Sequence, residues 1–446
     1  MKYLIVLFLI PVFCFSQNPN VRKLSEYMDK QFEINDFSGT VIVMKKDSVL
    51  LRKAYGLANR EFEVKNSVET KFVLASVTKY FTAIAIMQLV EQQKLSVDDK
   101  LSKYFPAYPN GEKVTIHMLL THTAGLPLDF DDLYMNSTTI SKDSANVILM
   151  RKPYLFEPGT ACKYSNVGYF LLGQIIEKAS GKSYADFLKQ HIFDKARMTG
   201  SGICNNDSIV RMKADIYYKE NGKYAKNPYL NWNLNVGHDG AYSTVDDLYK
   251  LDRAMYGNSI LSSESRAKME TKYNSRFPDG GFFDSYGYGI IIDPYYNHGH
   301  SLRTHSGGFI GVMTTFDRYP DDDLFIAVLS NNGSESHMVS YALSAIVFGI
   351  PVEMPYIHKA IEIAPTKLTA FAGEYQNVKI IASDDKLFLN TLDDEFVPES
   401  QTKFFRKGNP DRTFEFLMDR KGKVTSVLVG KGGVKEKKSR LTKLKR

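Results

Sequence analysis

The spacing of hydrophobic residues predicts an α+β arrangement in the first part of the chain. Residues 20–32 place apolar positions on one side of a helix, and the next two apolar runs are rich in β-forming residues. Lys46 and Asp47 separate these two runs and predict a tight turn between them. The expected elements are a helix over 20–32, strands over 39–45 and 48–55, and a helix over 77–95.

A mostly helical middle region follows, and strands return before residue 349. The helix expected over 167–179 is closed by Gly181, because glycine commonly terminates helices. Turn signals at 123–127 and 157–160 precede this helix. Further helices are expected over 245–255 and 339–347, and strands around 288–292, 311–316 and 324–329.

The pattern changes near residue 350, where prolines interrupt the periodic apolar positions. This interruption predicts a linker over 350–366. Beyond it, short alternating apolar segments separated by Asp, Gly and Asn predict a small β-domain over 367–446, of barrel-like form. A chain of 446 residues exceeds one compact core, which agrees with a main domain over 17–349 and a small second domain.

The first sixteen residues have the features of a secretory signal peptide. Lys2 precedes an apolar run over 3–13, and the small residues Cys14 and Ser16 lie three and one positions before the expected cleavage site. The apolar run is too short to span a bilayer. Lipidation at Cys14 is a competing interpretation, which the lack of small residues before it disfavours. We therefore expect residues 1–16 to be removed and the protein to be periplasmic or secreted.

Positive charge is concentrated at the C-terminal end. The chain has 57 Lys and Arg against 50 Asp and Glu, a formal net charge of +7. Residues 401–446 hold fifteen basic and four acidic side chains, so the rest of the chain is slightly acidic. The basic tail over 435–446 either makes weak contact with anionic envelope polymers or is simply solvated. We expect no nucleic-acid partner, and the oligomeric state stays open.

Cysteine and histidine usage argues against a metal site. Once the signal peptide is removed, only Cys162 and Cys204 remain. They either form a disulfide in an oxidising compartment or stay as two separate buried thiols. The nine histidines are scattered, without a His-Glu-x-x-His pair. We therefore expect neither a metal nor another cofactor.

Three short motifs, in order along the chain, point to nucleophilic catalysis. They are Ser-Val-Thr-Lys at 76–79, Tyr-Ser-Asn at 164–166 and His-Ser-Gly-Gly at 305–308. Each is weak alone, because Ser-x-x-Lys and Tyr-x-Asn recur elsewhere in the chain. The evidence for a shared active site comes from the order of the motifs and from the position of Ser76 at the start of a predicted helix. Together they predict an acyl-transferring serine hydrolase that acts on a small-molecule or peptide substrate.

Two side chains are candidates for the base that activates Ser76. Lys79 lies one helical turn after Ser76 and is the first candidate, provided that burial keeps its amine neutral part of the time. Tyr164 is the second, acting as a phenolate or as the general acid for the leaving group. Asn166 is expected to hold a substrate amide and to orient Lys79. The sequence does not decide between the two bases.

Backbone N–H groups are expected to bind the oxygen that becomes negative during acyl transfer. A helix start and a glycine-rich strand both present such donors without side-chain entropy. We assign this role to the N–H groups of Ser76 and Gly308. His122, which lies in a turn, is expected to cap or pack and is left outside the site.

These motifs and their surroundings resemble the serine β-lactamase and penicillin-binding protein superfamily, nearest to the class C enzymes and the related esterases and D-aminopeptidases. The resemblance spans roughly residues 20–348. It implies a β-lactamase/transpeptidase-like fold, with an antiparallel sheet flanked by helices beside a mostly helical lobe. The segment beyond the linker resembles a small β-barrel appendage that some relatives carry. The stretches that carry the resemblance are 119–127, 156–160, 164–173 and 240–248.

The resemblance also implies roles for the motif residues. Matched by position, Ser76 is the acylated nucleophile, Lys79 and Tyr164 are the proton-handling pair, and Asn166 is a substrate contact. The strand that lines the cleft is expected to contribute His305, Ser306 and Gly307.

His305 departs from the pattern of many β-lactamases, which have lysine at this position to attract the carboxylate of a β-lactam. Histidine is mostly neutral near pH 7. Arg303, two residues earlier, is expected to face the same side of the strand and to replace the missing cation. Esters, D-amino-acid amides and peptides are therefore favoured as substrates. The alternatives are a D,D-peptidase, a true β-lactamase, a non-hydrolytic penicillin-binding sensor and an adhesion module.

Overall fold

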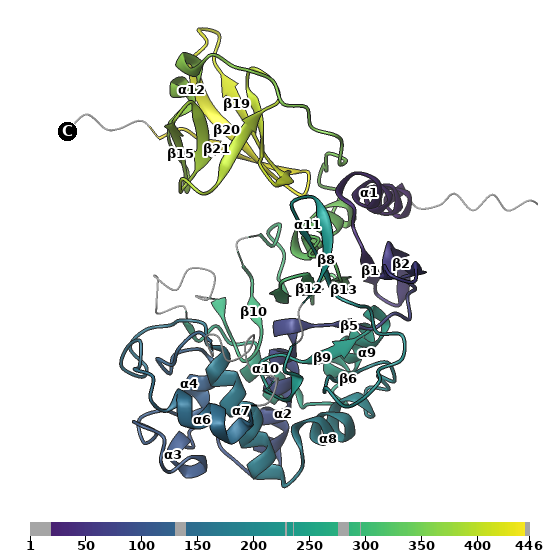
Figure 1. Cartoon of the computed structure of the whole chain (residues 1–446), viewed down its shortest axis with the longest axis vertical. Helices are drawn as coiled ribbons and strands as arrows, with labels where there is room; N and C mark the ends of the chain where they lie inside the picture. Colours follow the sequence, from purple (N-terminus) through teal and green to yellow (C-terminus); the bar gives the residue numbers. More distant parts are fainter. Residues whose placement is uncertain are drawn as a thin grey trace, which may run out of the picture.

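The structure of the protein is a computed structural model that describes residues 19–129, 140–227, 230–234, 236–274, 285–294 and 296–441. The predicted signal peptide over 1–16 lies outside these residues. Among the helices described, none has both the length and the apolar character needed to cross a bilayer. Figure 1 shows a large main domain with a small C-terminal sheet above it.

The main domain is built on a six-stranded antiparallel sheet. Its strands are β1 (Gly39–Lys45), β2 (Ser48–Tyr55), β10 (Ile291–Ile292), β11 (Arg303–Phe309), β12 (Val312–Tyr319) and β13 (Leu324–Ser330). Their order is β10-β11-β12-β13-β1-β2, so the N-terminal hairpin lies beside strands from the end of the domain. The hairpin has the predicted boundaries. The strand expected around 288–292 is reduced to two residues.

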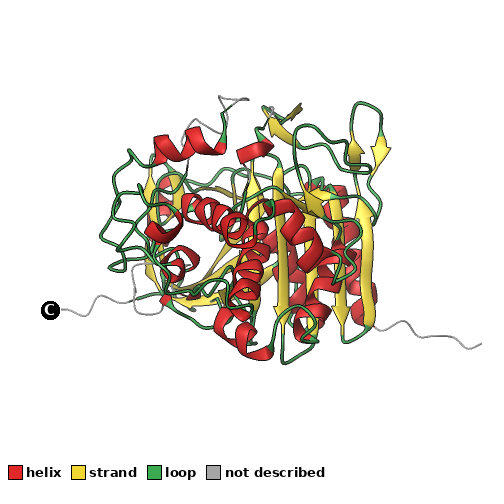
Figure 2. Ribbon diagram, turned by 90° about the horizontal axis from the view of Figure 1, so that it is seen from below, coloured by secondary structure: helices red, strands yellow, loops and turns green. Residues whose placement is uncertain are grey.

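Helices cover both faces of this sheet, which explains why β1 and β13 are almost continuously apolar. On one face, α1 (Pro19–Asn35) and α11 (Ser336–Val347) form a core with Val41 and Val43 of β1. On the other face, the larger core joins Ile42 to α2 (Thr78–Glu91), α7 (Asn166–Ser180) and α9 (Val245–Tyr256). Figure 2 shows helices, in red, packed against the strands of a sheet, in yellow.

The helices α2 and α7 carry two of the three motifs. A 3₁₀ turn at Ala75–Val77 leads directly into α2, which ends at Glu91 rather than at the predicted Leu95. Most of α2 is buried, so its sequence is apolar on nearly all sides. The hydroxyl of Ser165 caps α7 by accepting a hydrogen bond from the Gly168 N–H, and Gly181 ends α7 with a φ of 70°.

Short elements complete the main domain around α2 and α7. The helices are α3 (Leu101–Tyr104), α4 (Ile116–Leu120), α6 (Lys142–Leu149), α8 (Tyr184–Leu188) and α10 (Ser263–Met269). The short strands are β3 (Leu57–Asn59), β4 (Val64–Lys65), β5 (Phe72–Val73), β6 (Gly202–Ile203), β7 (Tyr217–Glu220), β8 (Lys223–Lys226) and β9 (Ala241–Ser243).

The connection between the two domains is shorter than predicted. Residues 350–364 contain no helix or strand, but α12 (Pro365–Phe371) begins inside the span expected to be linker. Pro365 occupies the start of this helix, where its missing N–H removes no intrahelical hydrogen bond. The proline therefore starts a helix of the second domain instead of marking a linker.

The C-terminal domain is an eight-stranded antiparallel sheet in which the strands follow one another in sequence order. A bridge between Tyr375 and Arg440 joins the first strand to the segment after the last, so the sheet curls into the expected barrel-like form. Aromatic side chains fill its interior, as in the stacked pair Phe396 and Phe414, whose ring centroids lie 3.8 Å apart. The strands are β14 (Gly373–Tyr375), β15 (Val378–Ser383), β16 (Lys386–Leu389), β17 (Glu395–Pro398), β18 (Lys403–Arg406), β19 (Asn409–Met418), β20 (Val424–Lys431) and β21 (Val434–Ser439).

Part of the basic tail belongs to this sheet. Residues 434–439 form β21, and Lys435 forms ion pairs with Glu415 at 3.0 Å and with Glu353 at 3.5 Å. The expectation that the whole segment from 435 is a free, solvated tail is therefore wrong. Its lysines lie on a paired strand, where strand pairing and nearby carboxylates hold them. Residues 442–446 lie outside the described part of the chain.

Candidate active site

The turn before α2 places Ser76 at the edge of the buried core. Ala75 has a φ of 49°, in the left-handed region that non-glycine residues rarely adopt. Ser76 is half-buried although Ala75 and Val77 are buried. A strained residue beside a candidate nucleophile is typical of functional sites. The turn therefore keeps the Ser76 side chain partly exposed next to a helix whose other residues face the interior.

Lys79 is the centre of a hydrogen-bond network. Its side-chain nitrogen lies 3.0 Å from Ser76 Oγ, 2.7 Å from Asn166 Oδ1 and 2.8 Å from the carbonyl oxygen of His238. The last two atoms are oxygens that can only accept, so each takes one N–H of the amine. A neutral amine then has its lone pair left for Ser76. The network thus joins Lys79 to three other residues, of which His238 is 159 positions away in the sequence.

Burial controls the charge of Lys79. The residue is completely buried, and desolvation lowers its pKa to about 7, against the opposing effect of Asp239 and Asp129. Burial also raises the pKa of the Asp239 carboxyl to about 6. Near neutral pH a substantial fraction of Lys79 is therefore the free amine, which is the form that a general base requires.

The pKa of Tyr164 is shifted in the opposite direction from that of Lys79. Burial raises the pKa of its phenol well above the usual range, although a hydrogen bond with Ser76 opposes this shift. The Lys79 nitrogen lies 4.8 Å from the centre of the Tyr164 ring. The phenol is consequently neutral and suited to donating a proton. The structure favours Lys79 as the base and Tyr164 as the acid, a choice that the sequence left open.

His305 is a neutral hydrogen-bonding residue in this structure. Its Nδ1 lies 2.7 Å from the carbonyl oxygen of Ser306, so Nδ1 carries the proton and Nε2 accepts a hydrogen bond from the Tyr286 hydroxyl at 3.0 Å. Burial is the main cause that lowers the pKa of His305 to about 3. The imidazole therefore brings no positive charge to the site at neutral pH.

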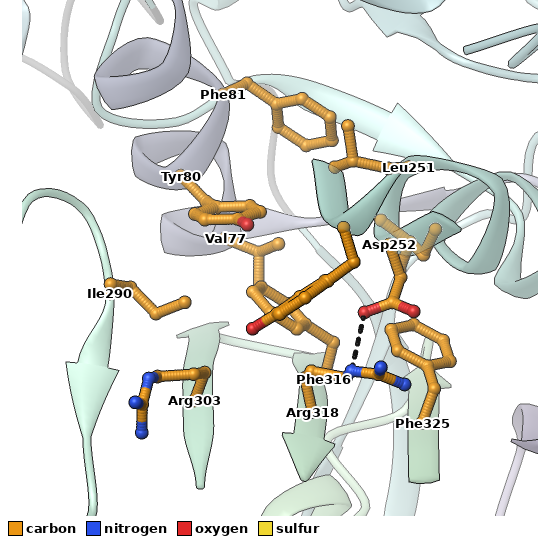
Figure 3. A pocket seen from close by; sticks show the side chains of 12 residues that line it. Val77, Tyr80, Phe81, Leu251, Asp252, Ile290, Arg303, Phe316, Arg318 and Phe325 are labelled. Carbon is orange, nitrogen blue, oxygen red and sulfur yellow. Dashed lines mark ion pairs between the residues drawn. The ribbon is translucent and has the colours of Figure 1, made fainter. Parts of the chain in front are cut away.

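Arg303 does not replace the missing cation. Its guanidinium forms ion pairs with Glu270 at 2.9 Å and with Asp293 at 3.0 Å. Together with Tyr80 of α2 it lines a cavity of about 10 Å³, whose lining does not include Ser76 or Lys79. Figure 3 shows this cavity and the ion pair of Arg318 with Asp252 across it. The expectation that Arg303 offers a free cation beside His305 is wrong, because two carboxylates hold its charge.

The glycines of β11 allow the strand to approach Ser76 closely. A Cβ at Gly307 would lie 2.2 Å from the carbonyl oxygen of Leu74 and 2.8 Å from the Ser76 nitrogen, so only glycine fits there. Ser306 and Gly308 alternate to the other face of the strand. The roles of the Ser76 and Gly308 N–H groups as oxyanion donors stay predictions, as does the substrate contact of Asn166.

Two residues of the site were missed or set aside by sequence reasoning. Asp239 lies in a stretch whose sequence indicates only a turn, and nothing in that stretch indicates that its charge acts on Lys79. His122 is buried, accepts a hydrogen bond from the Ser165 N–H at 3.1 Å and lies 4.4 Å from the Tyr164 ring, centroid to centroid. Its packing role was expected, but its position directly against Tyr164 was not.

Cys162 and Cys204 do not form a disulfide, and Cys204 is buried whereas Cys162 is partly exposed. The Asn274 side chain donates a hydrogen bond to Cys162 Sγ at 3.0 Å. Among the residues that the structure describes, no three His, Cys, Asp or Glu side chains are grouped so as to hold a metal ion.

Comparison with known proteins finds one matching protein family and several similar proteins. The sequence profile of the Beta-lactamase family matches residues 24–346. Penicillin-binding protein 4* of Bacillus subtilis is 29% identical over 407 residues, which cover 84% of this chain and 88% of that protein. A teichoic acid D-alanine hydrolase of Staphylococcus aureus is 24% identical over 340 residues, which cover 74% and 79%. The crystal structure of a penicillin-binding protein from Bacillus halodurans has a TM-score of 0.65 at 30% identity and covers 74% of this chain and 99% of that one.

Proposed function

Because this chain belongs to the beta-lactamase family, we propose that it is a serine hydrolase that forms an acyl-enzyme at Ser76 and transfers the acyl group to water. The observation that carries the proposal is the 3.0 Å contact between the Ser76 hydroxyl and a buried lysine whose pKa lies near 7. An exposed lysine has a pKa near 10.4 and would be protonated at neutral pH. Lys79 can instead accept the serine proton.

The acylation step follows from these contacts. Lys79 takes the proton of the Ser76 hydroxyl while Oγ forms a bond to the substrate carbonyl carbon. The carbonyl oxygen becomes negative, and the N–H groups of Ser76 and Gly308 are proposed to stabilise it. Tyr164 donates its proton to the leaving oxygen or nitrogen as the bond to that atom breaks, and the proton held by Lys79 restores the phenol. Attack by water reverses these transfers and releases the acid.

The charges around Ser76 favour a D-aminoacyl ester or amide as the substrate. The neutral His305 offers no cation for the carboxylate of a β-lactam. Asp129 accepts a hydrogen bond from Asn166 at 3.4 Å and adds negative charge beside Lys79. A substrate with an ammonium group suits this environment better than one with a carboxylate. The relative from Staphylococcus aureus, named for D-alanine hydrolysis from teichoic acid, supports the same substrate class.

We also propose that the enzyme acts outside the cytoplasm. The proposal rests on the charge and apolar pattern of residues 1–16. N-terminal sequencing of protein recovered from the producing cell tests it. A mature chain that begins at Gln17 supports export, and a chain that retains Met1 and remains in the cytoplasm contradicts it.

Labelling and turnover test the central proposal together. A fluorophosphonate should give one adduct, which peptide mapping by mass spectrometry should assign to Ser76. Substitution Ser76→Ala should abolish both the adduct and the hydrolysis of a D-alanyl aryl ester. Ser383→Ala is the matched control, because Ser383 and Lys386 repeat the Ser-x-x-Lys pattern in a strand pair of the C-terminal domain. Labelling that persists in Ser76→Ala would refute the nucleophile.

A penicillin-binding sensor is the second candidate, and the similarity to penicillin-binding protein 4* favours it. Such a protein is acylated by substrate or penicillin but does not release the acyl group. Pre-steady-state kinetics separates the two candidates. One equivalent of product per protein followed by no further release supports the sensor, and continued turnover supports the hydrolase.

A further inference from the structure

Asp239 lies in a backbone segment that α2 holds on both sides. Before it, the Thr82 hydroxyl donates a hydrogen bond to the carbonyl oxygen of Gly237 at 2.6 Å. After it, the Ala241 N–H donates to the Thr78 hydroxyl at 3.0 Å. Both hydroxyls belong to α2 and are one helical turn apart, so the backbone of the segment has a fixed position beside this helix.

The side chain of Asp239 borders open space. Asp239 is the one residue of the segment 236–241 that is not buried. Its Oδ1 accepts a hydrogen bond from the Gly240 N–H at 2.6 Å. Among the residues that the structure describes, Asp239 forms no other hydrogen bond and no ion pair. The second carboxylate oxygen is therefore open to a ligand.

The charge of Asp239 is compensated only while Lys79 is protonated. Burial raises the pKa of the Asp239 carboxyl to about 6, so the group is mostly ionised at pH 7. Among the side chains described, Lys79 is the cation that lowers this pKa, whereas Asp129 raises it. A general base must be the neutral amine, and in that form Lys79 no longer compensates the carboxylate. The reactive form of the site therefore has an excess of negative charge beside Ser76.

Asp239 is close enough to Ser76 to contact a substrate bound there. The His238 carbonyl oxygen accepts a hydrogen bond from Lys79 Nζ at 2.8 Å, and Nζ lies 3.0 Å from Ser76 Oγ. In a trans peptide this oxygen is about 2.8 Å from the next Cα, so the Asp239 Cα lies within about 9 Å of Ser76 Oγ. A carboxylate oxygen extends about 3 Å from its own Cα, and an α-ammonium nitrogen lies about 2.5 Å from the carbonyl carbon that Oγ attacks. With an ion-pair contact of about 2.8 Å between them, these lengths span the distance.

We propose that Asp239 determines substrate specificity by binding the α-ammonium group of an aminoacyl ester or amide through its second carboxylate oxygen. The proposal rests on the proposed hydrolase function and names the residue that selects for the positive charge. The bound ammonium replaces the charge that Lys79 gives up when it becomes a base. As a nearby like charge it also favours the neutral form of Lys79, so substrate binding and activation of the base support each other.

Three aryl esters of one acyl skeleton test the proposal on the full-length protein at pH 7. The esters of D-alanine, isobutyric acid and methylmalonic acid carry an ammonium, a methyl or a carboxylate group at the same carbon. Dividing kcat/KM for a charged ester by kcat/KM for the neutral ester cancels any effect of a substitution on Lys79. In Asp239→Asn this ratio should fall roughly 10- to 100-fold for the ammonium ester and rise for the carboxylate ester.

Asp419→Asn is the matched control. The Asp419 carboxylate also accepts a backbone N–H in a turn, from Lys421 at 2.8 Å, but it belongs to the C-terminal domain. This variant should leave both ratios unchanged. Equal changes of kcat/KM for all three esters in Asp239→Asn would overturn the proposal, because the substrate charge then has no part in the effect. A wild-type kcat/KM that is lower for the D-alanine ester than for the neutral ester would also overturn it.

The wild type provides a second measurement, which does not depend on the folding of a variant. As pH falls through about 6, Asp239 takes up a proton and loses the charge that binds the ammonium. The ratio of kcat/KM for the D-alanine ester to that for the neutral ester should therefore fall below pH 6, although the ammonium keeps its own charge. The fall should be absent in Asp239→Asn, which distinguishes this carboxyl from that of Asp129. A wild-type ratio that stays constant between pH 7 and pH 4.5 would contradict the proposal.

Other titratable groups that interact with Asp239 do not produce this fall. The carboxylate shifts the pKa of Lys79 and those of three groups that burial keeps neutral over the whole range, namely Tyr164, Tyr184 and Cys204. Lys79 titrates near pH 7, but its protonation slows hydrolysis of both esters and cancels in the ratio.

Failure of the hydrolase proposal gives a different result. If the wild type hydrolyses none of the three esters, the amides of D-alanine and isobutyric acid are titrated into Ser76→Ala protein, with and without Asp239→Asn. Isothermal titration calorimetry should show that D-alanine amide binds more tightly than isobutyramide and that Asp239→Asn weakens its binding about tenfold or more. Absent binding, equal affinities of the two amides, or a D-alanine amide affinity that Asp239→Asn leaves unchanged would overturn the specificity role independently of the catalytic proposal.

Discussion

The half-buried carboxyl of Asp239 and the buried amine of Lys79 each oppose the effect of desolvation on the pKa of the other. Asp239 is the first of the charges that raise the pKa of Lys79, and Lys79 in turn lowers the pKa of Asp239. Desolvation is nevertheless the larger effect on both groups, and it leaves the lysine near pH 7 and the carboxyl near pH 6. The pKa of Lys79, the candidate base, is therefore influenced by a residue that lies outside all three sequence motifs.

Activity should rise with pH through the pKa of Lys79. Below about pH 7 the amine is increasingly protonated and cannot take the Ser76 proton, so kcat/KM should fall about tenfold per pH unit. The measurement is the pH dependence of kcat/KM for a neutral aryl ester, whose own charge does not change over the range. A profile that stays flat down to pH 5 would contradict a lysine base.

Asp239→Asn should move that rise to lower pH. Desolvation lowers the pKa of Lys79, and the carboxylate of Asp239 partly offsets this effect. Removing the carboxylate should therefore lower the pKa of Lys79 further. The asparagine oxygen can still accept the hydrogen bond that the Gly240 N–H donates at 2.6 Å, so the turn is retained. Asp194→Asn, at an exposed residue paired with Lys189, is the control and should leave the profile unchanged. A shift to higher pH in Asp239→Asn would reverse the assigned sign.

Gly307→Ala should damage catalysis more than folding. The added Cβ would meet the Leu74 carbonyl oxygen at 2.2 Å and the Ser76 nitrogen at 2.8 Å, so the strand must move away from the nucleophile. Displacing one oxyanion donor costs on the order of 10² to 10³ in kcat. Gly168→Ala is the control, because the nearest atom to its added Cβ is 3.6 Å away. Near-normal kcat in Gly307→Ala would show that the close approach is not needed.

Tyr286→Phe should destabilise the protein through His305. It removes the donor 3.0 Å from Nε2 and leaves that buried nitrogen without its hydrogen bond. The expected loss is about 1–3 kcal/mol in the free energy of unfolding, measured by urea denaturation. Tyr273→Phe removes a hydroxyl that bonds the Lys268 carbonyl at the surface and should change stability by less than about 0.5 kcal/mol. Equal losses of unfolding free energy in the two variants would show that the buried hydrogen bond contributes no more stability than the surface one.

Local sequence patterns were sufficient for elements whose geometry is set by neighbouring residues. The two runs of β-forming residues over 39–45 and 48–55 predicted both strands of the first hairpin with their boundaries. Ser76 and Lys79 are one helical turn apart, so their contact follows from helix geometry once a helix is recognised. Gly181 ended its helix as expected, because a left-handed residue is most easily supplied by glycine.

Sequence patterns were insufficient where a partner comes from a distant segment. Period-two alternation gives the face on which Arg303 lies, but not that Glu270 and Asp293 already hold its charge. The lysine-rich composition after residue 434 indicated solvation, whereas pairing with β20 makes a strand of it. The composition of a segment does not reveal which strand it pairs with. A charged strand at the edge of a sheet therefore looks like a solvated tail in the sequence.

The order of the motifs and the local spacing of Ser76 and Lys79 were therefore decided by the sequence itself, since turns, helix faces and strand alternation depend on residues close in the chain. The protonation of Lys79, Tyr164 and His305 was decided only by the tertiary structure. Desolvation depends on every segment that excludes water from a group, and Lys79 also bonds Asn166 and His238, which lie 87 and 159 positions away in the sequence. The sequence identified the candidate reactive residues, but only their burial in the folded chain sets the direction in which the pKa of each is shifted.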